Sequence, residues 1–362
     1  MKIMHIAYGH RTDDTRILKK ECVSLAKSGY EVIYVTSDKL SKDTSDFGSV
    51  KRIILPLRSN DRLKRLSLYM RDVKKLVKRE KPDVCHIHDF QIITLILHIS
   101  GITKCVFDSH EDHPGLIADS QFKRLNYRIK YEAVKFVERI CFRKCVFVVA
   151  ATPYIRQQIA KIASKVIDVN NYPVLERFGS AKEYDGSRIC FTGGTGVSSG
   201  LINVAKAIKN TAYKLVIAGN CSEDFYEELM KYSGGNVEYL GYLDKSEVDR
   251  VIESSLVGIV TYMPTVNNSH ALPNKMFEYM ERGTPIIYSS FPDWIDMLNK
   301  YNVGISVDPG SPEEIKKALD SVCINDHYRS ELSRNAREAI ESVFNWKNEE
   351  KKLLEAYNSL IS

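Results

Sequence analysis

The feature that most constrains the fold of this chain is a regular alternation of short apolar runs and helical stretches. Six apolar runs of strand length occupy the first half of the chain: 2–7, 31–36, 52–57, 83–88, 104–108 and 145–151. Helical patterns lie between them, such as the one over 16–27 that Gly29 ends. Strands joined through helices need crossover connections, so the alternation predicts a parallel sheet covered on both faces.

The same alternation starts again in the second half. Its apolar runs lie at 188–192, 213–218, 237–240, 256–261, 285–289 and 303–307. A chain of 362 residues is also too long for one ordinary core. We therefore predict an α/β protein with two Rossmann-like, doubly wound domains, 1–169 and 188–345, joined by a linker at 170–187. The amphipathic segment 346–362 is expected to pack back on the first domain.

Composition excludes several classes of protein. The chain is 44% apolar and 27% charged, as expected of a globular protein, and it contains no apolar run of the ~20 residues that span a bilayer. The eight cysteines form no Cys-x-x-Cys pair, which argues against a disulfide framework or a zinc site. The N-terminus lacks the pattern of a signal peptide, so we expect a cytoplasmic protein.

The net charge of +6 conceals an uneven distribution. Residues 1–165 contain 32 Lys and Arg against 18 Asp and Glu, whereas the remainder is acidic. A basic first half indicates an anionic partner, such as a lipid surface, a phosphate ligand or a nucleic acid. The basic helices predicted at 62–81 and 123–144 are either solvated faces or contacts for anionic headgroups. No nucleic-acid-reading motif accompanies them, so we expect no nucleic-acid partner.

The stretch 267–289 combines a polar loop, a helix start at Pro273 and Asn274, and a strand after Pro285. His270, Asn274 and Lys275 fall at or just before the helix N-terminus, where free amides and the macrodipole favour an anion. Glu278 shares a face with Asn274, four residues earlier. A phosphorylated ligand with hydroxyl groups suits this arrangement, although an ordinary capped helix also explains it.

A glycine-rich turn, Gly193–Gly200, follows the first strand of the second half and precedes a helix. It lacks the third glycine of a dinucleotide fingerprint, because Ser199 occupies that place. The next strand ends in Gly219-Asn220, without the acidic residue that holds an adenosine ribose. NAD is therefore not expected, and the turn either approaches another ligand or is simply tight.

Polar residues follow the strands of the first half at one edge of its sheet, where ligands of parallel sheets bind. They are Gly9, His10, Asp89 and the ionisable segment Asp108–His113. Pro114 and Gly115 indicate a loop, so a metal site there has no defined geometry. His110 is the candidate catalytic or substrate-orienting residue, with a solvated acidic loop as the alternative. His86, within a strand, is expected to be buried and hydrogen-bonded.

Taken together, these patterns resemble the retaining glycosyltransferases of the GT-B fold, specifically glycosyltransferase family four of the bacterial polysaccharide type. The resemblance is strongest over Leu272–Ile287, which is similar to the family's donor-site segment. Supporting segments are His10 through Asp14-Thr-Arg16, Asp108-Ser-His110-Glu111, Val216–Gly219, Leu240–Leu243 and Val303–Pro309.

The resemblance implies two domains facing each other across a cleft, with the nucleotide-sugar donor bound by the second. Glu278 would accept the ribose hydroxyls, and Lys275 with the amides near Asn274 would bind the diphosphate. His110 would lie near the reacting carbon. The implied catalytic residues are His110, Lys275 and Glu278. The full donor set is Gly193, Gly194, Asn220, Tyr242, Leu243, His270, Ala271, Leu272, Asn274, Lys275 and Glu278. The acceptor side would comprise Gly9, His10, Arg16, Asp89 and Glu111.

Two departures from the family pattern affect the donor site. His270 stands where the family often has a glutamate for the donor sugar. Gly194 and Ser199 stand where an Arg and a Lys usually contact the diphosphate. Lys275 is therefore expected to be the main cation on the phosphates.

We accordingly expect a retaining hexosyltransferase that uses a UDP-sugar and requires no metal or other cofactor. Its acceptor would be a glycan or a polyprenyl-diphosphate-linked glycan in surface polysaccharide synthesis, at the inner face of the cell membrane. Two alternatives remain at this point. One is a nucleotide-sugar epimerase of the same fold, and the other is a non-catalytic partner subunit of that fold.

Overall fold

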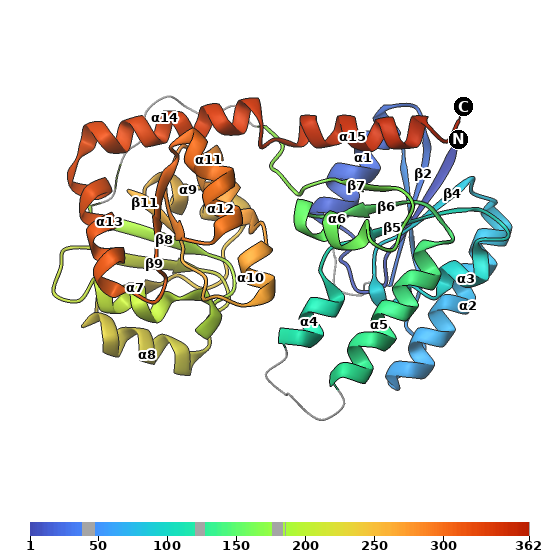
Figure 1. Cartoon of the computed structure of the whole chain (residues 1–362), viewed down its shortest axis with the longest axis horizontal. Helices are drawn as coiled ribbons and strands as arrows, with labels where there is room; N and C mark the ends of the chain where they lie inside the picture. The colour runs from blue at the N-terminus through green and yellow to red at the C-terminus, as the bar shows by residue number, and fades with distance from the viewer. Residues whose placement is uncertain (38–47, 120–126, 176–183, 185, 362) are drawn as a thin grey trace. The chain divides into compact units, whose positions relative to one another are not determined.

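The computed structural model describes residues 1–37, 48–119, 127–175, 184 and 186–361, and it divides into two compact units (Figure 1). Unit 1 comprises Met1–Asn171 with Trp346–Ser362, and unit 2 comprises Tyr172–Asn345. Each contains a parallel sheet with helices packed on it, so the predicted α/β class is confirmed. Parts of the expected linker (176–183 and 185) and of the second basic helix (123–126) lie outside the described residues.

The sheet of unit 1 has, among the described residues, seven parallel strands in the order β3-β2-β1-β4-β5-β6-β7. The strands are β1 (Lys2–Ile6), β2 (Glu31–Thr36), β3 (Val50–Ile54), β4 (Val84–Ile87), β5 (Lys104–Ser109), β6 (Cys145–Ala150) and β7 (Val166–Asp168). The helices are η1 (Thr15–Cys22), α1 (Val23–Lys27), α2 (Arg62–Glu80), η2 (Phe90–Ile92), α3 (Leu95–Ile99), α4 (His113–Asp119), α5 (Tyr127–Phe142), α6 (Pro153–Ile159) and α15 (Trp346–Asn358).

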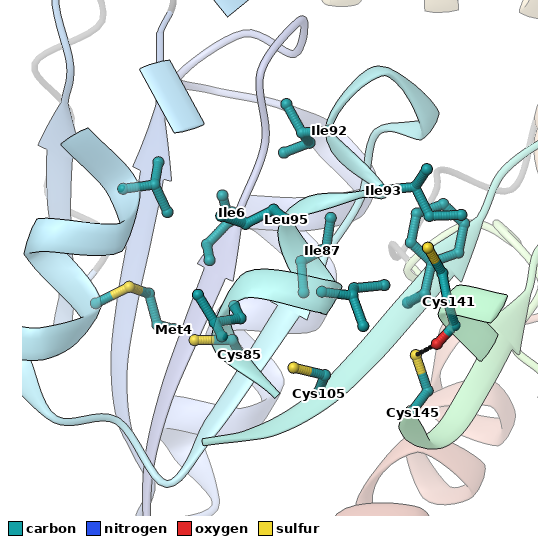
Figure 2. Packing of buried hydrophobic residues seen from close by; sticks show 14 of the residues in the cluster. Met4, Ile6, Cys85, Ile87, Ile92, Ile93, Leu95, Cys105, Cys141 and Cys145 are labelled. Carbon is teal, nitrogen blue, oxygen red and sulfur yellow. Dashed lines mark hydrogen bonds between the residues drawn. The ribbon is translucent and has the colours of Figure 1, made fainter. Parts of the chain in front are cut away.

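Both faces of this sheet are buried, because successive side chains of a strand point to opposite sides. One face packs against α2, α3 and α5, and Figure 2 shows its strand residues Met4, Ile6, Cys85 and Ile87. The other face packs against η1, α1 and α15. The apolar runs predicted from the sequence thus supply two hydrophobic cores, one on each face of the sheet.

Five of the eight cysteines belong to these cores: Cys22, Cys85, Cys105, Cys141 and Cys145. All eight are free, and six of them are buried. Cys141 and Cys145 lie close together near the end of α5 (Figure 2), where the Cys145 thiol donates a hydrogen bond to the Cys141 carbonyl oxygen at 3.5 Å.

Helix α15 is part of unit 1, although it is the last helix of the chain. The Trp346 indole Nε1 donates to Ser24 Oγ at 2.9 Å, and the backbone amide of Asn170 donates to a Glu349 carboxylate oxygen at 2.8 Å. The Tyr357 hydroxyl lies 2.9 Å from His86 Nδ1 inside the core. These contacts fix the helix against η1 and the sheet.

The sheet of unit 2 has, within the described ranges, six parallel strands in the order β10-β9-β8-β11-β12-β13. The strands are β8 (Arg188–Thr192), β9 (Lys214–Ala218), β10 (Val237–Tyr239), β11 (Val257–Val260), β12 (Ile286–Ser289) and β13 (Gly304–Val307). The helices are η3 (Val197–Ser199), α7 (Leu201–Ala207), α8 (Glu223–Ser233), α9 (Lys245–Glu253), α10 (Val266–His270), α11 (Asn274–Glu281), α12 (Pro292–Leu298), η4 (Asn299–Tyr301), α13 (Pro312–Ile324) and α14 (Asp326–Ser342).

Helix α11 lies against β11 at a very short distance. A Cβ atom at Gly258 would come within 2.2 Å of the Tyr279 ring, so only glycine allows this approach. The Tyr279 hydroxyl accepts a hydrogen bond from the Thr192 amide at 2.8 Å, which ties α11 to the end of β8. Gly283, with φ of +63°, ends the helix as its sequence position predicts.

Three local expectations are corrected by the structure. The polar loop expected at 267–272 contains helix α10, which Thr265 caps by accepting a hydrogen bond from the Asn268 amide at 3.1 Å. The helix expected over 16–27 begins as the π-helix η1. Strand β7 was not predicted, because its three half-buried residues form only a short apolar pattern. No helix of the described chain is both long and apolar enough to cross a bilayer.

Candidate functional site

The carboxyl ends of β1, β4 and β5 bring together a polar group that we call the unit 1 rim: Tyr8, Gly9, His10, Asp14, Asp89, Asp108 and His110. Asp89 follows β4 and connects this group to the end of β1. One of its carboxylate oxygens accepts the Tyr8 amide at 2.6 Å, and the other lies 3.6 Å from His10 Nε2. The sequence prediction placed Gly9, His10, Asp89 and His110 at one edge of the sheet, and the structure brings them together.

His10 is held between two carboxylates. Its Nδ1 lies 3.2 Å from Asp14 Oδ2, while the other Asp14 oxygen caps η1 by accepting the Ile17 amide at 2.8 Å. Burial alone would lower the pKa of His10, but the hydrogen bond to Asp14 and the charge of Asp89 outweigh burial and raise that pKa. His10 therefore keeps its proton to a higher pH than an ordinary histidine does.

His110 is fixed by a carboxylate in the interior. Its Nε2 is 2.9 Å from Asp108 Oδ2, and its ring lies edge-on to the ring of His10 with 5.0 Å between centroids. Arg16 donates to both oxygens of Asp108, each at 2.9 Å. Burial opposes ionisation of Asp108, but Arg16 and His110 hold the pKa of this carboxyl well below its usual range. A buried anion therefore orients the partly exposed imidazole of His110.

These contacts correct the expectation for the segment Asp108–His113. It was predicted to be a loop after the strand, but Asp108 and Ser109 are buried residues of β5, and His113 begins α4. Arg16, expected on the acceptor side, is also buried and bonded to Asp108 and to the Val169 carbonyl. The side chain of Glu111 is exposed to solvent.

A second polar cluster lies behind the rim, in the core between the sheet and η1. It consists of His5, Glu21, His86 and His88, all buried. His5 Nδ1 is 2.9 Å from His88 Nε2, and Glu21 Oε2 is 3.9 Å from both His5 Nδ1 and His86 Nδ1. Burial lowers the pKa of His5 and His86 well below their usual value, so both are neutral. His86 is buried and hydrogen-bonded, as predicted.

The charges of this cluster are coupled to those of the rim. Arg16 is the buried cation nearest to two buried carboxylates, Asp108 and Glu21, and its Nε lies 3.2 Å from Glu21 Oε1. Burial, and then the charge of Asp108, raise the pKa of Glu21 well above its ordinary value. One arginine neutralises one carboxylate, and we infer that Glu21 retains its proton.

Two groups of side chains among the described residues have the composition of metal ligands. One is His5, Glu21, His86 and His88, and the other is His88, Asp108 and His110; in each, the ligand atoms lie within 4.8 Å of one another. In the structure several of these atoms contact each other or Arg16 and Tyr357. The sequence showed His86 and His88 on one side of a strand. It gave no sign that Glu21 and Asp108 would join them.

In unit 2 the glycine-rich turn folds over the end of the sheet with its backbone in close contact with two other segments. A Cβ atom at Gly219, where φ is +139°, would lie 2.3 Å from the Gly193 carbonyl oxygen. One at Gly200, where φ is +70°, would lie 1.8 Å from the Thr261 carbonyl oxygen. The Thr195 amide donates to the Asn220 carbonyl at 2.9 Å. Glycine is needed at these positions, because other residues would displace backbone.

Lys275, in the first turn of α11, lies under this turn. Its side chain is only 8% exposed, and its ammonium nitrogen lies 3.3 Å from the centroid of the Phe191 ring. A Cβ atom at Gly193 would be 3.5 Å from the same nitrogen. Burial lowers the pKa of Lys275 to about 7, and the Glu278 carboxylate opposes this shift. Among the described residues this amine forms no hydrogen bond or ion pair, and Glu278 acts on it only through its charge.

The other predicted donor residues lie along or near the same helix start. Asn274 and Glu278 are on α11, at least partly exposed, one turn apart. His270 Nδ1 is 2.6 Å from Asp293 Oδ2, and the Trp294 indole donates to the Ala271 carbonyl at 2.7 Å. Helix α12 thus fixes the backbone that leads into α11. Asp293 and Trp294 were not identified as part of this region from the sequence.

The remaining predicted donor residues are less closely associated. Gly193, Gly194 and Asn220 have exposed surface at the turn. Tyr242 is 79% exposed, whereas Leu243 packs partly on the core of unit 2, as Leu272 does. The structure therefore brings Gly193 and Lys275 into direct proximity, and it leaves Tyr242 projecting into solvent.

Comparisons with known proteins agree with this architecture. Solved structures of other proteins match essentially the whole chain, and two of them illustrate the similarity. Sucrose-phosphate synthase from Thermosynechococcus elongatus has 17% identity and a TM-score of 0.75, with 99% of each chain covered. Anabaena Alr3699/HepE, solved in complex with UDP and glucose, has 12% identity and a TM-score of 0.74, with 99% of this chain and 100% of that chain covered. These similarities show that the fold is the two-domain GT-B fold.

Sequence comparisons identify the class of enzyme. A family model described as Glycosyltransferase Family 4 matches residues 16–169, and one described as Glycosyl transferases group 1 matches residues 196–339. The uncharacterized glycosyltransferase MJ1069 of Methanocaldococcus jannaschii is 23% identical over 279 residues, which is 70% of this chain and 68% of that protein. The chain is a glycosyltransferase of the GT-B fold.

Proposed function

We propose that this glycosyltransferase transfers a sugar from a nucleoside-diphosphate sugar, with UDP as the leaving group. The observation that carries the proposal is the buried amine of Lys275 beneath the glycine-rich turn. An amine with a pKa of about 7 and no acceptor among the described residues gains both charge and hydrogen bonds when a phosphate arrives. The N-terminal amides of α11 add further donors for the same anion.

The resemblance to family-four enzymes supplies the remaining donor roles. Glu278 would accept hydrogen bonds from the ribose hydroxyls, one turn along α11 from Asn274. His270, held by Asp293, would replace the glutamate that family members often use for the donor sugar. The HepE structure contains UDP and glucose, which supports a UDP-sugar for this chain as well.

We propose that transfer retains the anomeric configuration and needs no bound metal. Lys275 would stabilise the negative charge that develops on the departing diphosphate, as preorganised cations do in other sites. The departing phosphate oxygen can take the acceptor proton, so retention needs no separate base. His110, oriented by Asp108, would contact the reacting sugar or the acceptor hydroxyl from unit 1.

The acceptor that we propose is a glycan, or a glycan linked to polyprenyl diphosphate, in surface polysaccharide synthesis. The excess of basic residues in the first half suits an anionic acceptor or membrane, and a cytoplasmic protein peripheral to the inner membrane face would meet both. Because the matched family models and the relative are glycosyltransferases, the epimerase and the non-catalytic subunit are not favoured.

A ligand that binds only the folded protein raises its unfolding midpoint, which gives a direct test of the donor site. The wild type, Lys275→Ala and Glu278→Ala should be compared with UDP, UMP, ADP and GDP. UDP should stabilise the wild type most, Lys275→Ala should lose the preference for UDP over UMP, and Glu278→Ala should weaken all nucleotides. Equal shifts in all three proteins would show that the site is elsewhere.

A second measurement tests the reaction. Release of UDP from UDP-sugars should be detectable in the wild type and lost in Lys275→Ala. Product analysis after incubation with UDP-sugar alone separates a transferase from an epimerase, because only an epimerase would return an isomeric UDP-sugar. If neither Lys275→Ala nor Glu278→Ala changes the rate of UDP release, the roles assigned to these two residues are contradicted.

A further inference from the structure

Helix α5 (Tyr127–Phe142) of unit 1 has apolar residues on two opposite sides, although only one side can face the core. Cys141 and Phe142 are buried in the core beneath the sheet, and Val137 packs against it. On the outside, Ile129 is 70% exposed and Phe136 is 64% exposed, with the exposed Ala133 between them. These are among the most exposed large apolar side chains described for the protein.

The exposed apolar residues form one continuous stripe along the helix. Residues 129, 133 and 136 are spaced by four and three, the interval at which side chains on a helix lie above one another. At 100° per residue they fall within an arc of about 60°. Residues 138, 141 and 142, which are buried, lie on the opposite side. Surface helices normally present polar residues there, so the outer stripe of Ile129, Ala133 and Phe136 is unusual.

Cations border this outer stripe on both sides. Arg128 and Arg139 lie on one flank and Lys130 on the other, and all three are exposed. Arg143 and Lys144 continue the positive charge just beyond the helix. One exposed carboxylate of α5, Glu132, lies on the same flank as Arg128 and Arg139, beside the stripe, and the other described acidic residue of the helix, Glu138, is buried near His113.

We propose that the outer stripe of α5 inserts into the headgroup region of an anionic lipid bilayer, with the flanking cations on the lipid phosphates. An apolar stripe with a cationic border is the pattern of helices that lie in a membrane interface. A second copy of this chain is a poor occupant, because stripe-to-stripe packing would bring like charges together. Nucleic acid is also a poor occupant, because its phosphates would contact the cations but would leave the apolar residues between them without a partner. The inference deepens the proposed function by placing the enzyme where a lipid-linked acceptor would be.

The test measures co-sedimentation of the full-length protein with vesicles of phosphatidylcholine alone or mixed with phosphatidylglycerol. Wild type should bind the anionic vesicles, and raised salt should weaken binding. The double variant Ile129→Ser/Phe136→Ser should bind at least about tenfold more weakly, since two large apolar side chains no longer enter the interface. Arg128→Gln/Lys130→Gln should also bind several-fold more weakly and show a smaller salt dependence, since Arg139, Arg143 and Lys144 remain.

The control is Ile324→Ser, because Ile324 is 74% exposed at the end of α13 in unit 2. It should bind vesicles as the wild type does. The thermal midpoint of the double variant should match that of the wild type, since the altered residues are exposed. Absence of wild-type binding to anionic vesicles, or equal binding by the double variant, would overturn the proposal.

This outcome is separate from that of the proposed reaction. The UDP-induced thermal shift measures the donor site of unit 2 and should be unchanged in the double variant. Absence of a UDP-induced thermal shift in the wild type would refute the donor assignment. Vesicle binding would still be tested independently by co-sedimentation. Wild-type UDP binding without vesicle binding would refute only the membrane contact.

Discussion

Replacing Lys275 with methionine should make the ligand-free protein more stable, although we assign this residue to substrate binding. The side chain is buried with its amine 3.3 Å from the Phe191 ring centroid, and burial lowers its pKa from 10.5 to about 7. Folding at neutral pH must therefore either bury a charge or release a proton. Methionine is similar in length, packs well on aromatic rings and carries no charge.

The magnitude follows from these two pKa values. Between pH 7 and 10.5 the unfolded chain holds more protons at this position than the folded one, so wild-type stability rises with pH through that window. With a folded pKa of about 7, linkage gives a penalty of about 4 kcal/mol at pH 7 and about 2 kcal/mol at pH 9. Attraction between the ammonium and the ring, about 1–2 kcal/mol, reduces what methionine gains.

Urea unfolding of the wild type and Lys275→Met at pH 7 and pH 9 measures this difference. The variant should be the more stable protein at pH 7, the difference should shrink by about half at pH 9, and UDP should no longer raise its midpoint. Lys231→Met, at an exposed lysine of α8, is the matched control and should show no pH-dependent difference. A variant less stable than the wild type at pH 7, or a difference independent of pH, would refute the reasoning.

Three further substitutions test the buried network and the glycine-rich turn. The pKa of Glu21 is raised in the folded protein, so its protonated side chain stabilises the fold fully below pH 4.5 and progressively less as pH rises. Glu21→Gln should reduce this pH-dependent loss of stability. Urea unfolding from pH 5 to 8 measures the difference. Asp108→Asn leaves Arg16 buried without its bidentate partner, and calorimetry should show a loss of about 3–5 kcal/mol. Gly200→Ala would push a Cβ atom to 1.8 Å from the Thr261 carbonyl, so the unfolding midpoint and UDP binding should both fall; an unchanged midpoint would show that the turn is not so constrained.

Much of the fold could be predicted because its strands are nearly continuous apolar runs, and such runs occur where a parallel sheet is buried on both faces. The runs at 31–36 and 104–108 became β2 and β5 with almost the expected bounds. Strand β7 is short and half-buried, so it has little of this pattern. Helix α10 has no buried residue, and its sequence is polar except for Val266, so hydrophobic periodicity does not reveal it.

The candidate site could be predicted only where its residues lie close together in the sequence. Lys275 and Glu278 belong to one helix start, so their spacing places them together before any tertiary contact is known. The pairing of Arg16 with Asp108 joins residues 92 positions apart, and neither residue's neighbours in sequence indicate the other. Glu21 is similar, because its burial depends on the packing of η1 against the sheet. Local sequence therefore predicts a candidate anion-binding motif but not the charges that orient His110.

The two units differ in whether their buried charged side chains are paired, and this difference bears on how the enzyme works. In unit 1, Arg16 and Asp108 neutralise each other, and His110 is oriented before any substrate binds. In unit 2, the amine of Lys275 lies beneath the turn with a lowered pKa and no acceptor within the described chain. Preorganisation in unit 1 reduces the reorganisation needed at the reacting centre. On the proposed assignment, the donor diphosphate is the partner of this buried lysine, so part of the binding energy of the donor should be spent on restoring the lysine's charge. Because that restoration depends on the ligand's charge, the site should favour the diphosphate of the donor over the monophosphate UMP.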